Sequence, residues 1–207
     1  MYYKTITEKS TGEISEKKSR FIADMFPVTT EEEALLYIEQ IRKKYYDARH
    51  HCFAYVLNDE PVVERFSDDG EPSGTAGKPI LDVIKGAELK NTLIVVTRYF
   101  GGTLLGTGGL VRAYTAASRE AVASAFIVTR TYGYELSIET DYTGLGKIQY
   151  ILCQDGIPVI DTIYAESVEI LAFVPDSREK EIINKITEAT NAKSTITRKK
   201  EMWYEEK

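Results

Sequence analysis

Nine consecutive residues, Gly101–Gly109, hold five of the chain's fourteen glycines. The apolar run Thr92–Tyr99 comes directly before them, and an alanine-rich segment with helical periodicity, about Gly108–Phe126, follows. This pattern predicts a buried strand that ends in a tight loop and leads into a helix. Glycine lets backbone N–H groups approach a ligand closely, and the first turn of a helix has unpaired donors and a partial positive charge. The segment therefore predicts a cradle for an anion.

Two arginines would extend this cradle. Arg98 lies at the end of the predicted strand, and Arg112 lies in or near the first turn of the helix, where a cation alone is mildly unfavourable. The spacing matches neither a P-loop nor the GxGxxG dinucleotide fingerprint. The alternative, that the glycines serve only turns and close packing, stays open. The residues predicted to bind phosphate here are Arg98, Gly101, Gly102, Gly106, Gly108, Gly109 and Arg112.

A second unusual feature is the long polar stretch 65–79, which separates an expected hairpin (His50–Leu57 with Val62–Ser67) from an expected helix at Lys78–Ala87. Long loops within compact domains tend to be functional. The carboxylates could hold Mg²⁺. Alternatively, they pair with Arg98 or Arg112 or cap a turn and a helix, which is the interpretation we favour. The metal candidates are Asp68, Asp69 and Glu71, and Lys78 is a further phosphate candidate.

Two adjacent histidines begin the first strand of that hairpin. His50 and His51 would point to opposite faces of the strand, so they cannot easily bind one metal ion. His51 or the preceding Arg49 is predicted to contact a ligand. Cys52 shares its face with core positions and is predicted to be buried rather than nucleophilic. Arg20, in a short basic cluster, would extend a basic patch if the fold brings it beside Arg98.

Earlier segments predict a hairpin or long bent strand over 11–28 and a helix that starts at the capping box Thr30–Glu33. The later part has a clearer rhythm of strand, helix, strand, strand, helix, strand, which is the ferredoxin-like pattern. Its predicted strands are Tyr134–Thr140, Pro158–Tyr164, Ser167–Val174 and Lys193–Trp203, and its helices are Tyr142–Gln154 and Pro175–Ala189. We place the domains at 1–131 and 132–207.

Charge and cysteine content limit the partners. The chain has 26 Lys and Arg against 32 Asp and Glu, a formal net charge of −6, which excludes a uniformly basic nucleic-acid coat but not a local basic patch. No apolar run is long enough to span a bilayer, and Cys52 and Cys153 form no disulfide framework. We therefore expect a cytoplasmic protein without membrane association. The sequence leaves the oligomeric state open.

Four segments in this order resemble the Impact family, including its YigZ-like bacterial members: Lys18–Phe21, Ala48–Tyr55, Phe66–Gly77 and Arg98–Tyr114. The resemblance covers roughly residues 1–130. It implies an α+β protein whose N-terminal domain resembles domain 2 of ribosomal protein S5. The remainder resembles the small C-terminal domain of bacterial members, a ferredoxin-like βαββαβ domain similar to the last domain of elongation factor G.

The resemblance also implies a function. Eukaryotic members are associated with translational control, and they bind a large activator of the amino-acid-starvation kinase through a different N-terminal domain, so that partner is not expected here. Our first hypothesis is a translation-associated regulatory protein that binds RNA, the ribosome or a translation-related protein through an Arg/Gly-rich cleft, without DNA specificity or a cofactor. Its phosphate contacts would include Arg20, Arg49, His51, Lys78, Arg98 and Arg112.

A different class of function also stays open. A Mg²⁺-dependent enzyme acting on a nucleotide or small phosphorylated substrate would use Asp68 or Asp69 to position the ion or act as base, and His51 as the acid–base group. The kinases of the wider fold superfamily have a Ser-rich loop at this place, whereas Leu110 and Val111 stand here. A third hypothesis is an adaptor that binds another protein through an exposed apolar patch.

Overall fold

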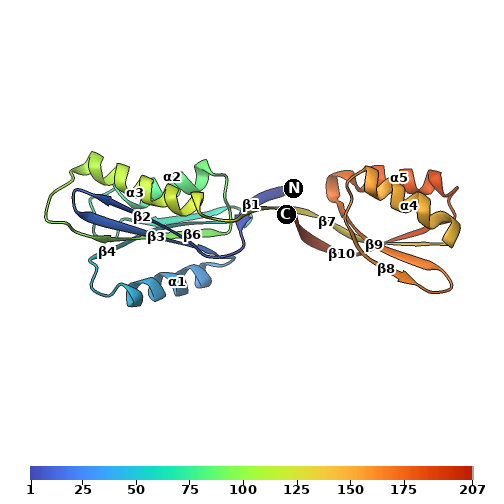
Figure 1. Ribbon diagram of the computed structural model, residues 1–207, viewed down its shortest axis with the longest axis horizontal. Coiled ribbons are helices and arrows are strands. Elements are labelled where there is room, and N and C mark those ends of the chain that lie inside the picture. The colour runs from blue at the N-terminus through green and yellow to red at the C-terminus, as the bar shows by residue number, and fades with distance from the viewer. Residues whose placement is uncertain (207) are drawn as a thin grey trace. The chain divides into compact units, whose positions relative to one another are not determined.

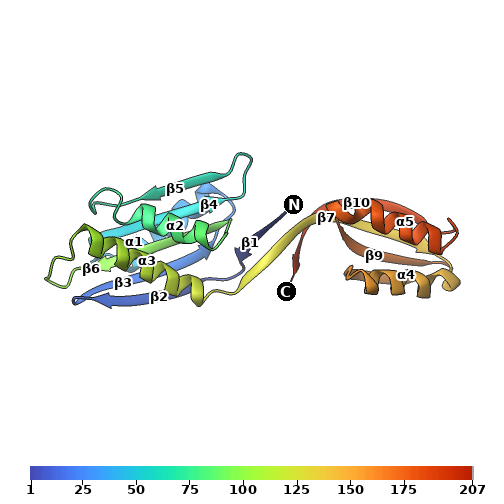
Figure 2. The same cartoon turned by 90° about the horizontal axis from the view of Figure 1, so that it is seen from above.

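The computed structural model describes residues 1–206. Its first sheet is antiparallel, with the strand order β2-β3-β6-β4-β5. The five strands are β2 (Ser10–Glu16), β3 (Ser19–Pro27), β4 (His50–Leu57), β5 (Val63–Ser67) and β6 (Thr92–Tyr99). Figure 2 shows them side by side. The predicted hairpin over 11–28 is confirmed, and β4 and β6 begin and end at the predicted residues.

Helices cover both faces of this sheet. The helix α1 (Glu31–Lys44) lies on one face, and α2 (Gly77–Gly86) and α3 (Thr107–Ala123) lie on the other (Figure 1). Alanines and β-branched residues fill the layer between the sheet and α2 and α3, and a smaller cluster lies under α1. The central strand β6 is therefore buried on both faces, which explains its uninterrupted apolar run.

Capping begins α1 as predicted, with one difference. The Thr30 side chain accepts a hydrogen bond from the Glu33 backbone N–H at 3.2 Å. The Glu33 carboxylate returns to the N–H and hydroxyl of Thr29, at 2.6 and 2.9 Å, and thus one residue earlier than a standard capping box. Both groups that would otherwise be unpaired at this helix end are satisfied by local sequence alone.

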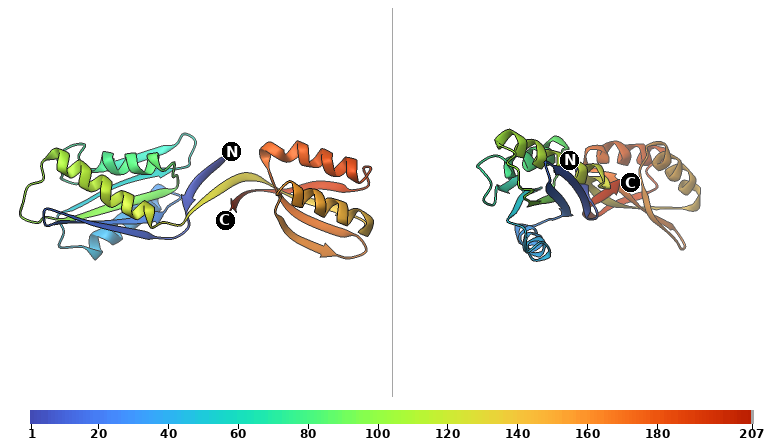
Figure 3. Two further views of the ribbon diagram at one scale, coloured as in Figure 1. Left: turned by 45° about the horizontal axis from the view of Figure 1, so that its top comes forward. Right: turned by 60° about the vertical axis from the view of Figure 1, so that its left-hand side comes forward.

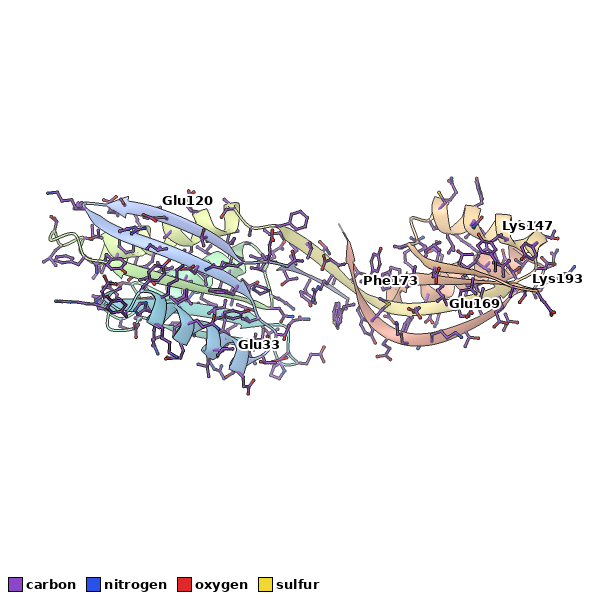
Figure 4. The ribbon with its side chains drawn as sticks, turned by 60° about the horizontal axis from the view of Figure 1, so that its bottom comes forward. Glu33, Glu120, Lys147, Glu169, Phe173 and Lys193 are labelled. Atoms are coloured by element: carbon purple, nitrogen blue, oxygen red, sulfur yellow. The ribbon has the colours of Figure 1, made fainter. Side chains whose placement is uncertain are left out.

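The second sheet has the ferredoxin-like order β10-β7-β9-β8, and a short strand β1 (Tyr2–Ile6) also borders β7. Its helices α4 (Tyr142–Gln154) and α5 (Glu179–Ala189) cover one face (Figure 3), while Glu169 and Phe173 lie on the other (Figure 4). The strands are β7 (Ile127–Thr140), β8 (Val159–Tyr164), β9 (Val168–Pro175) and β10 (Thr195–Glu206), with a 3₁₀ turn at Asp176–Arg178.

The predicted fold class, a two-domain α+β chain, is confirmed. Contacts divide the chain between Val128 and Thr129, and they assign Met1 and Tyr2 to the second unit. The sequence did not reveal β1, and β7 begins at Ile127 rather than at the predicted Tyr134, because long-range pairing with β10 extends it. Within residues 1–206, no helix combines the length and apolar character needed to cross a bilayer.

Candidate functional site

Strand register brings the four motif segments together at one end of the first sheet. Arg98, near the end of β6, lies opposite His50 of β4 on one side and Phe21 of β3 on the other. The loop between β5 and α2 and the loop between β6 and α3 leave the sheet at this same end, beside the β2–β3 turn (Figure 2). The sequence placed these segments far apart, and only the pairing of the strands joins them.

The glycine-rich loop has a structural part and an open part. A Cβ added at Gly101 would lie 2.0 Å from the Lys18 carbonyl carbon, and the Gly101 N–H donates to Ser19 Oγ at 3.1 Å. Gly101 is therefore required by close packing of the loop on the β2–β3 turn. Gly102 and Gly106 have positive φ angles of 82° and 72°, with no other atoms within 4 Å of an added Cβ. That part of the loop faces open space.

The first turn of α3 keeps its donors available. Its N-cap is Gly106, which has no side chain to accept from the turn, and the turn contains no acidic residue. Thr107 and Gly108 are exposed. Arg112 folds back so that its Nη1 would lie 3.7 Å from a Cβ placed on Gly108. A helix end with free N–H groups and a nearby guanidinium favours an anion.

Asp68 and Asp69, in the loop between β5 and α2, have structural roles. Asp68 Oδ1 accepts from the N–H groups of Ala76 and Gly77 at 3.0 and 2.8 Å, and Oδ2 accepts from Gly74 at 2.8 Å. Asp68 thus caps the start of α2. Asp69 accepts from the His51 backbone N–H at 2.7 Å and pairs with Arg42 at 3.3 Å, which fastens the loop to β4.

The third carboxylate is buried in an ion pair. Glu71 Oε1 accepts from Arg98 Nη1 at 2.7 Å and from the Tyr114 hydroxyl at 2.8 Å. The Cys52 thiol donates to the Tyr114 oxygen at 3.3 Å, and burial raises the pKa of both Cys52 and Tyr114. Cys52 is therefore a core residue, as its position on the strand predicted.

We favoured the interpretation that the acids of this loop pair with an arginine or cap a helix. The contacts of Asp68 and Glu71 agree with it. Protein donors engage Asp68, Asp69 and Glu71 in three separate places. Among the described residues, no group of three or more His, Cys, Asp or Glu side chains is arranged to hold a metal ion. The proposed Mg²⁺ site has no support in this arrangement.

A cavity of about 620 Å³ opens beside the buried ion pair, at the ends of β4 and β6. We call it the strand-end pocket. It is lined by Asp47, Ala48, Arg49, His50, Arg98, Tyr99, Phe100 and Leu104. The Arg98 side chain is 8% exposed, its guanidinium carbon lies 5.5 Å from the ring centres of both Phe21 and Phe100, and its Nε has no hydrogen-bond partner in residues 1–206.

Other parts of the pocket lining combine a polar pair, Tyr99 and Asp47, with two exposed apolar side chains, Phe100 and Leu104. The Tyr99 hydroxyl donates to Asp47 Oδ1 at 2.7 Å, and burial together with this bond raises the pKa of Tyr99 to about 12. Tyr99 is therefore a neutral donor at neutral pH. Phe100 and Leu104 are 53% and 82% exposed, which is unusual for large apolar side chains beside a polar cavity.

Four cations surround the β6–α3 loop without an ion-pair partner in the described part of the chain. We call them the basic rim: Lys17, Lys18, Arg49 and Arg112. Lys17 and Lys18 form the tight β2–β3 turn, where both have positive φ, and the Lys18 backbone borders Gly101. Arg49 lines the strand-end pocket, and Arg112 lies at the start of α3.

Besides Arg98, two more of the predicted phosphate contacts are already engaged by carboxylates. Arg20 forms a two-pronged ion pair with Glu13, at 2.5 and 2.8 Å, beside the end of α1. Lys78 pairs with Asp82 on α2. Because residues alternate along a strand, Arg20 falls on the face opposite Phe21, whose ring contacts Arg98. Arg20 therefore does not extend the basic rim.

Of the two histidines, the one predicted to contact a ligand does not line the pocket, whereas its neighbour does. His51 is buried, with Nδ1 3.1 Å from Thr97 Oγ1, and burial lowers its pKa. His50 lines the pocket, and its Nδ1 lies 2.8 Å from the Asp69 carbonyl oxygen, so this nitrogen carries the proton. Sequence reasoning preferred His51 to His50, and it missed Asp47, Phe100 and Leu104. Large apolar residues inside a glycine-rich loop were the signal that could have found the last two.

Two domain families match the chain. The Impact N-terminal domain matches residues 17–122, and a family described as a domain of unknown function (DUF1949) matches residues 138–193. A solved structure, described as the crystal structure of a hypothetical protein, is similar with a TM-score of 0.61 and 32% identity, covering 96% of this chain and 98% of that one.

Named relatives agree with the domain matches. The chain is 41% identical over 205 residues to the Impact family member YvyE of Bacillus subtilis, covering 99% of this chain and 94% of YvyE. It is 37% identical over 174 residues to the member YigZ of Escherichia coli, covering 83% of this chain and 85% of YigZ. Mouse Protein IMPACT is 32% identical over 98 residues, 45% of this chain and 30% of the mouse protein. On these grounds the chain belongs to the Impact family.

Proposed function

We propose that this protein is a translation-associated regulatory protein that binds single-stranded RNA at the β6–α3 end of its first sheet. The observation that carries the proposal is the basic rim: four cations without ion-pair partners in residues 1–206 surround a loop with free backbone donors. Lysine, arginine and helix N-termini are the groups that contact RNA phosphates. The translation association comes from the eukaryotic members of the family.

Exposed apolar groups beside these cations support RNA over a free anion. Phe100 and Leu104 are large apolar side chains that are 53% and 82% exposed beside these cations. Single-stranded nucleic acid binds to a positively charged surface on which bases stack against aromatic rings. The combination at this end of the sheet, where Arg49 and Phe100 line the same cavity, matches that requirement.

The alternative, a Mg²⁺-dependent enzyme, has less support. Its acid–base group would be His51, which is buried against Thr97. The carboxylates that would position the ion or act as base already cap α2 or pair with arginines. In the pocket, the Tyr99 hydroxyl and the Asp47 carboxylate are hydrogen-bonded to each other. This arrangement supports binding rather than catalysis.

The test measures the affinity of fluorescent single-stranded RNA at roughly 50 and 200 mM salt, for the intact chain and for Lys18→Ala and Arg112→Ala. Each variant should bind more weakly and should reduce the slope of log affinity against log salt by about 0.7 for each phosphate that it no longer neutralises. Arg119→Ala is the matched control, because Arg119 is exposed on α3 about two turns beyond Arg112.

Two outcomes would contradict the proposal. One is the absence of RNA binding at the lower salt concentration. The other is an equal decrease in affinity for Arg112→Ala and Arg119→Ala, because general charge rather than the rim would then determine affinity. Sedimentation with ribosomes from translating and stalled extracts tests the translation association separately, and the same variants should release the protein from the ribosome fraction.

A further inference from the structure

We propose that the strand-end pocket receives one unstacked base of the bound RNA and selects a base that bears an exocyclic amino group. This inference rests on the proposed function and adds a sequence preference to it. The basic rim contacts phosphates, which carry no sequence information. The strand-end pocket includes Arg49 of the rim and offers polar groups on its wall together with an exposed aromatic ring.

The pocket has a suitable size and a stacking surface. Its volume of about 620 Å³ falls within the roughly 300–1,000 Å³ of small-molecule sites. The ring of Phe100 is 53% exposed, and the Arg98 guanidinium, 5.5 Å from its centre, supports it from the protein side. An exposed ring held in place in this way can stack on a base. Leu104, across the loop, supplies a second apolar contact.

Asp47 supplies the selection. Its Oδ1 accepts from Tyr99, and no hydrogen bond engages its Oδ2 within residues 1–206. A carboxylate only accepts hydrogen bonds, so it favours the amino group of cytosine over the carbonyl oxygen that uracil has in the same place. Adenine and guanine also carry amino groups. The pocket wall therefore discriminates most clearly between cytosine and uracil, which have the same size.

Arg98 fixes the protein side of the pocket. Its side chain is more than nine-tenths buried, and its charge is paired with Glu71 at 2.7 Å. Its guanidinium carbon lies 5.5 Å from the centre of the Phe100 ring, so Arg98 helps to position the ring on which the base would stack.

The experiment compares oligocytidylate with oligouridylate of equal length in the RNA-binding assay. The intact chain should bind oligocytidylate about tenfold more tightly. Phe100→Ala should lower the affinity for both oligonucleotides by about tenfold, because the base then has no ring on which to stack. Asp47→Asn should abolish only the preference, since asparagine still accepts from Tyr99 through its amide oxygen. Phe126→Ala and Asp59→Asn are the matched exposed controls, and both should behave like the intact chain.

The outcomes separate this inference from the proposed function. If neither oligonucleotide binds, the proposed function fails and this inference fails with it. If both bind equally and Phe100→Ala has no effect, only the pocket assignment is overturned. Arg112→Ala should weaken both oligonucleotides by the same factor and leave the preference intact. Thermal unfolding checks that Phe100→Ala and Asp47→Asn remain folded.

Discussion

At the scale of single residues, Arg98 illustrates how a residue typical of a binding site is used to hold the fold. Its charge is paired with Glu71 in the protein interior, and its guanidinium lies between two phenylalanine rings. Removing one partner of such a pair leaves an uncompensated buried charge. Weaker ligand binding in an Arg98 variant would therefore report a disrupted fold rather than a missing ligand group.

This pair gives a direct prediction of stability. Arg98→Met and Glu71→Gln should each lower the free energy of unfolding by about 3–5 kcal/mol, because each leaves the other group without its partner. Combining Arg98→Met with Glu71→Gln should cost clearly less than the sum of the two changes. Urea denaturation of the four proteins measures this coupling. Additive losses of stability would mean that the two side chains do not depend on each other.

His51 predicts a dependence of stability on pH. Burial lowers its pKa below the ordinary value of 6.5, so between the two values the unfolded chain binds more protons than the folded one. The contribution of His51 to stability is therefore intact above about pH 6.5 and is lost as the pH falls below it. His51→Gln should lose less stability than the intact chain between about pH 7 and pH 5. Urea denaturation at each pH measures the free energy of unfolding. If this free energy falls in parallel for the intact chain and for His51→Gln, the assignment is wrong.

At the scale of elements, the β6–α3 loop is fixed at its start and open afterwards. Gly101 packs against the backbone of the β2–β3 turn, whereas the stretch that follows faces open space. This division explains how one glycine-rich segment can serve both tight packing and ligand access. The loop is anchored to the sheet immediately before its exposed amides.

Gly101→Ala should therefore destabilise the chain by about 1–3 kcal/mol, because the added Cβ would overlap the Lys18 backbone and force the turn to move. Gly86→Ala, near the end of α2, is the control, since a Cβ there meets nothing within 4 Å. Differential scanning calorimetry compares the two. Equal transition temperatures for both variants would show that the β2–β3 turn accommodates the methyl group.

At the scale of the whole molecule, the chain contains two separate units with separate cores. Ile6 and residues from β2 to α3 form the clusters on both faces of the first sheet, and residues from β7 onward form the cluster under α4 and α5. The candidate site lies entirely in the first unit, as do all four members of the basic rim. RNA binding should therefore depend on the first unit's core.

Leu152→Ala tests the independence of the cores. Leu152 is fully buried in the second core, and truncating it should cost about 2–5 kcal/mol. Hydrogen exchange should become faster in Thr129–Glu206 and stay unchanged in Tyr3–Val128. The exposed neighbour Gln154 provides the control, Gln154→Ala. Faster exchange throughout the chain would show that the two units unfold as one.

The sequence by itself determined the features that depend on neighbouring residues. The predicted bounds of β4, β6 and α4 agree with the structure, because apolar runs, strand alternation and helix-stop signals are local. The capping box of α1 is local for the same reason. The motif segments could be found in the sequence, but the sequence did not show that they meet at one end of the first sheet.

Only the tertiary structure decided which side chains remain available for a ligand. Glu71 and Arg98 are 27 residues apart and form a buried pair, while Arg20 is engaged by Glu13 across the β2–β3 hairpin. His50 rather than His51 lines the pocket. The physical reason is register: a strand alternates its side chains between two faces, and pairing between distant strands determines which charged groups come within bonding distance.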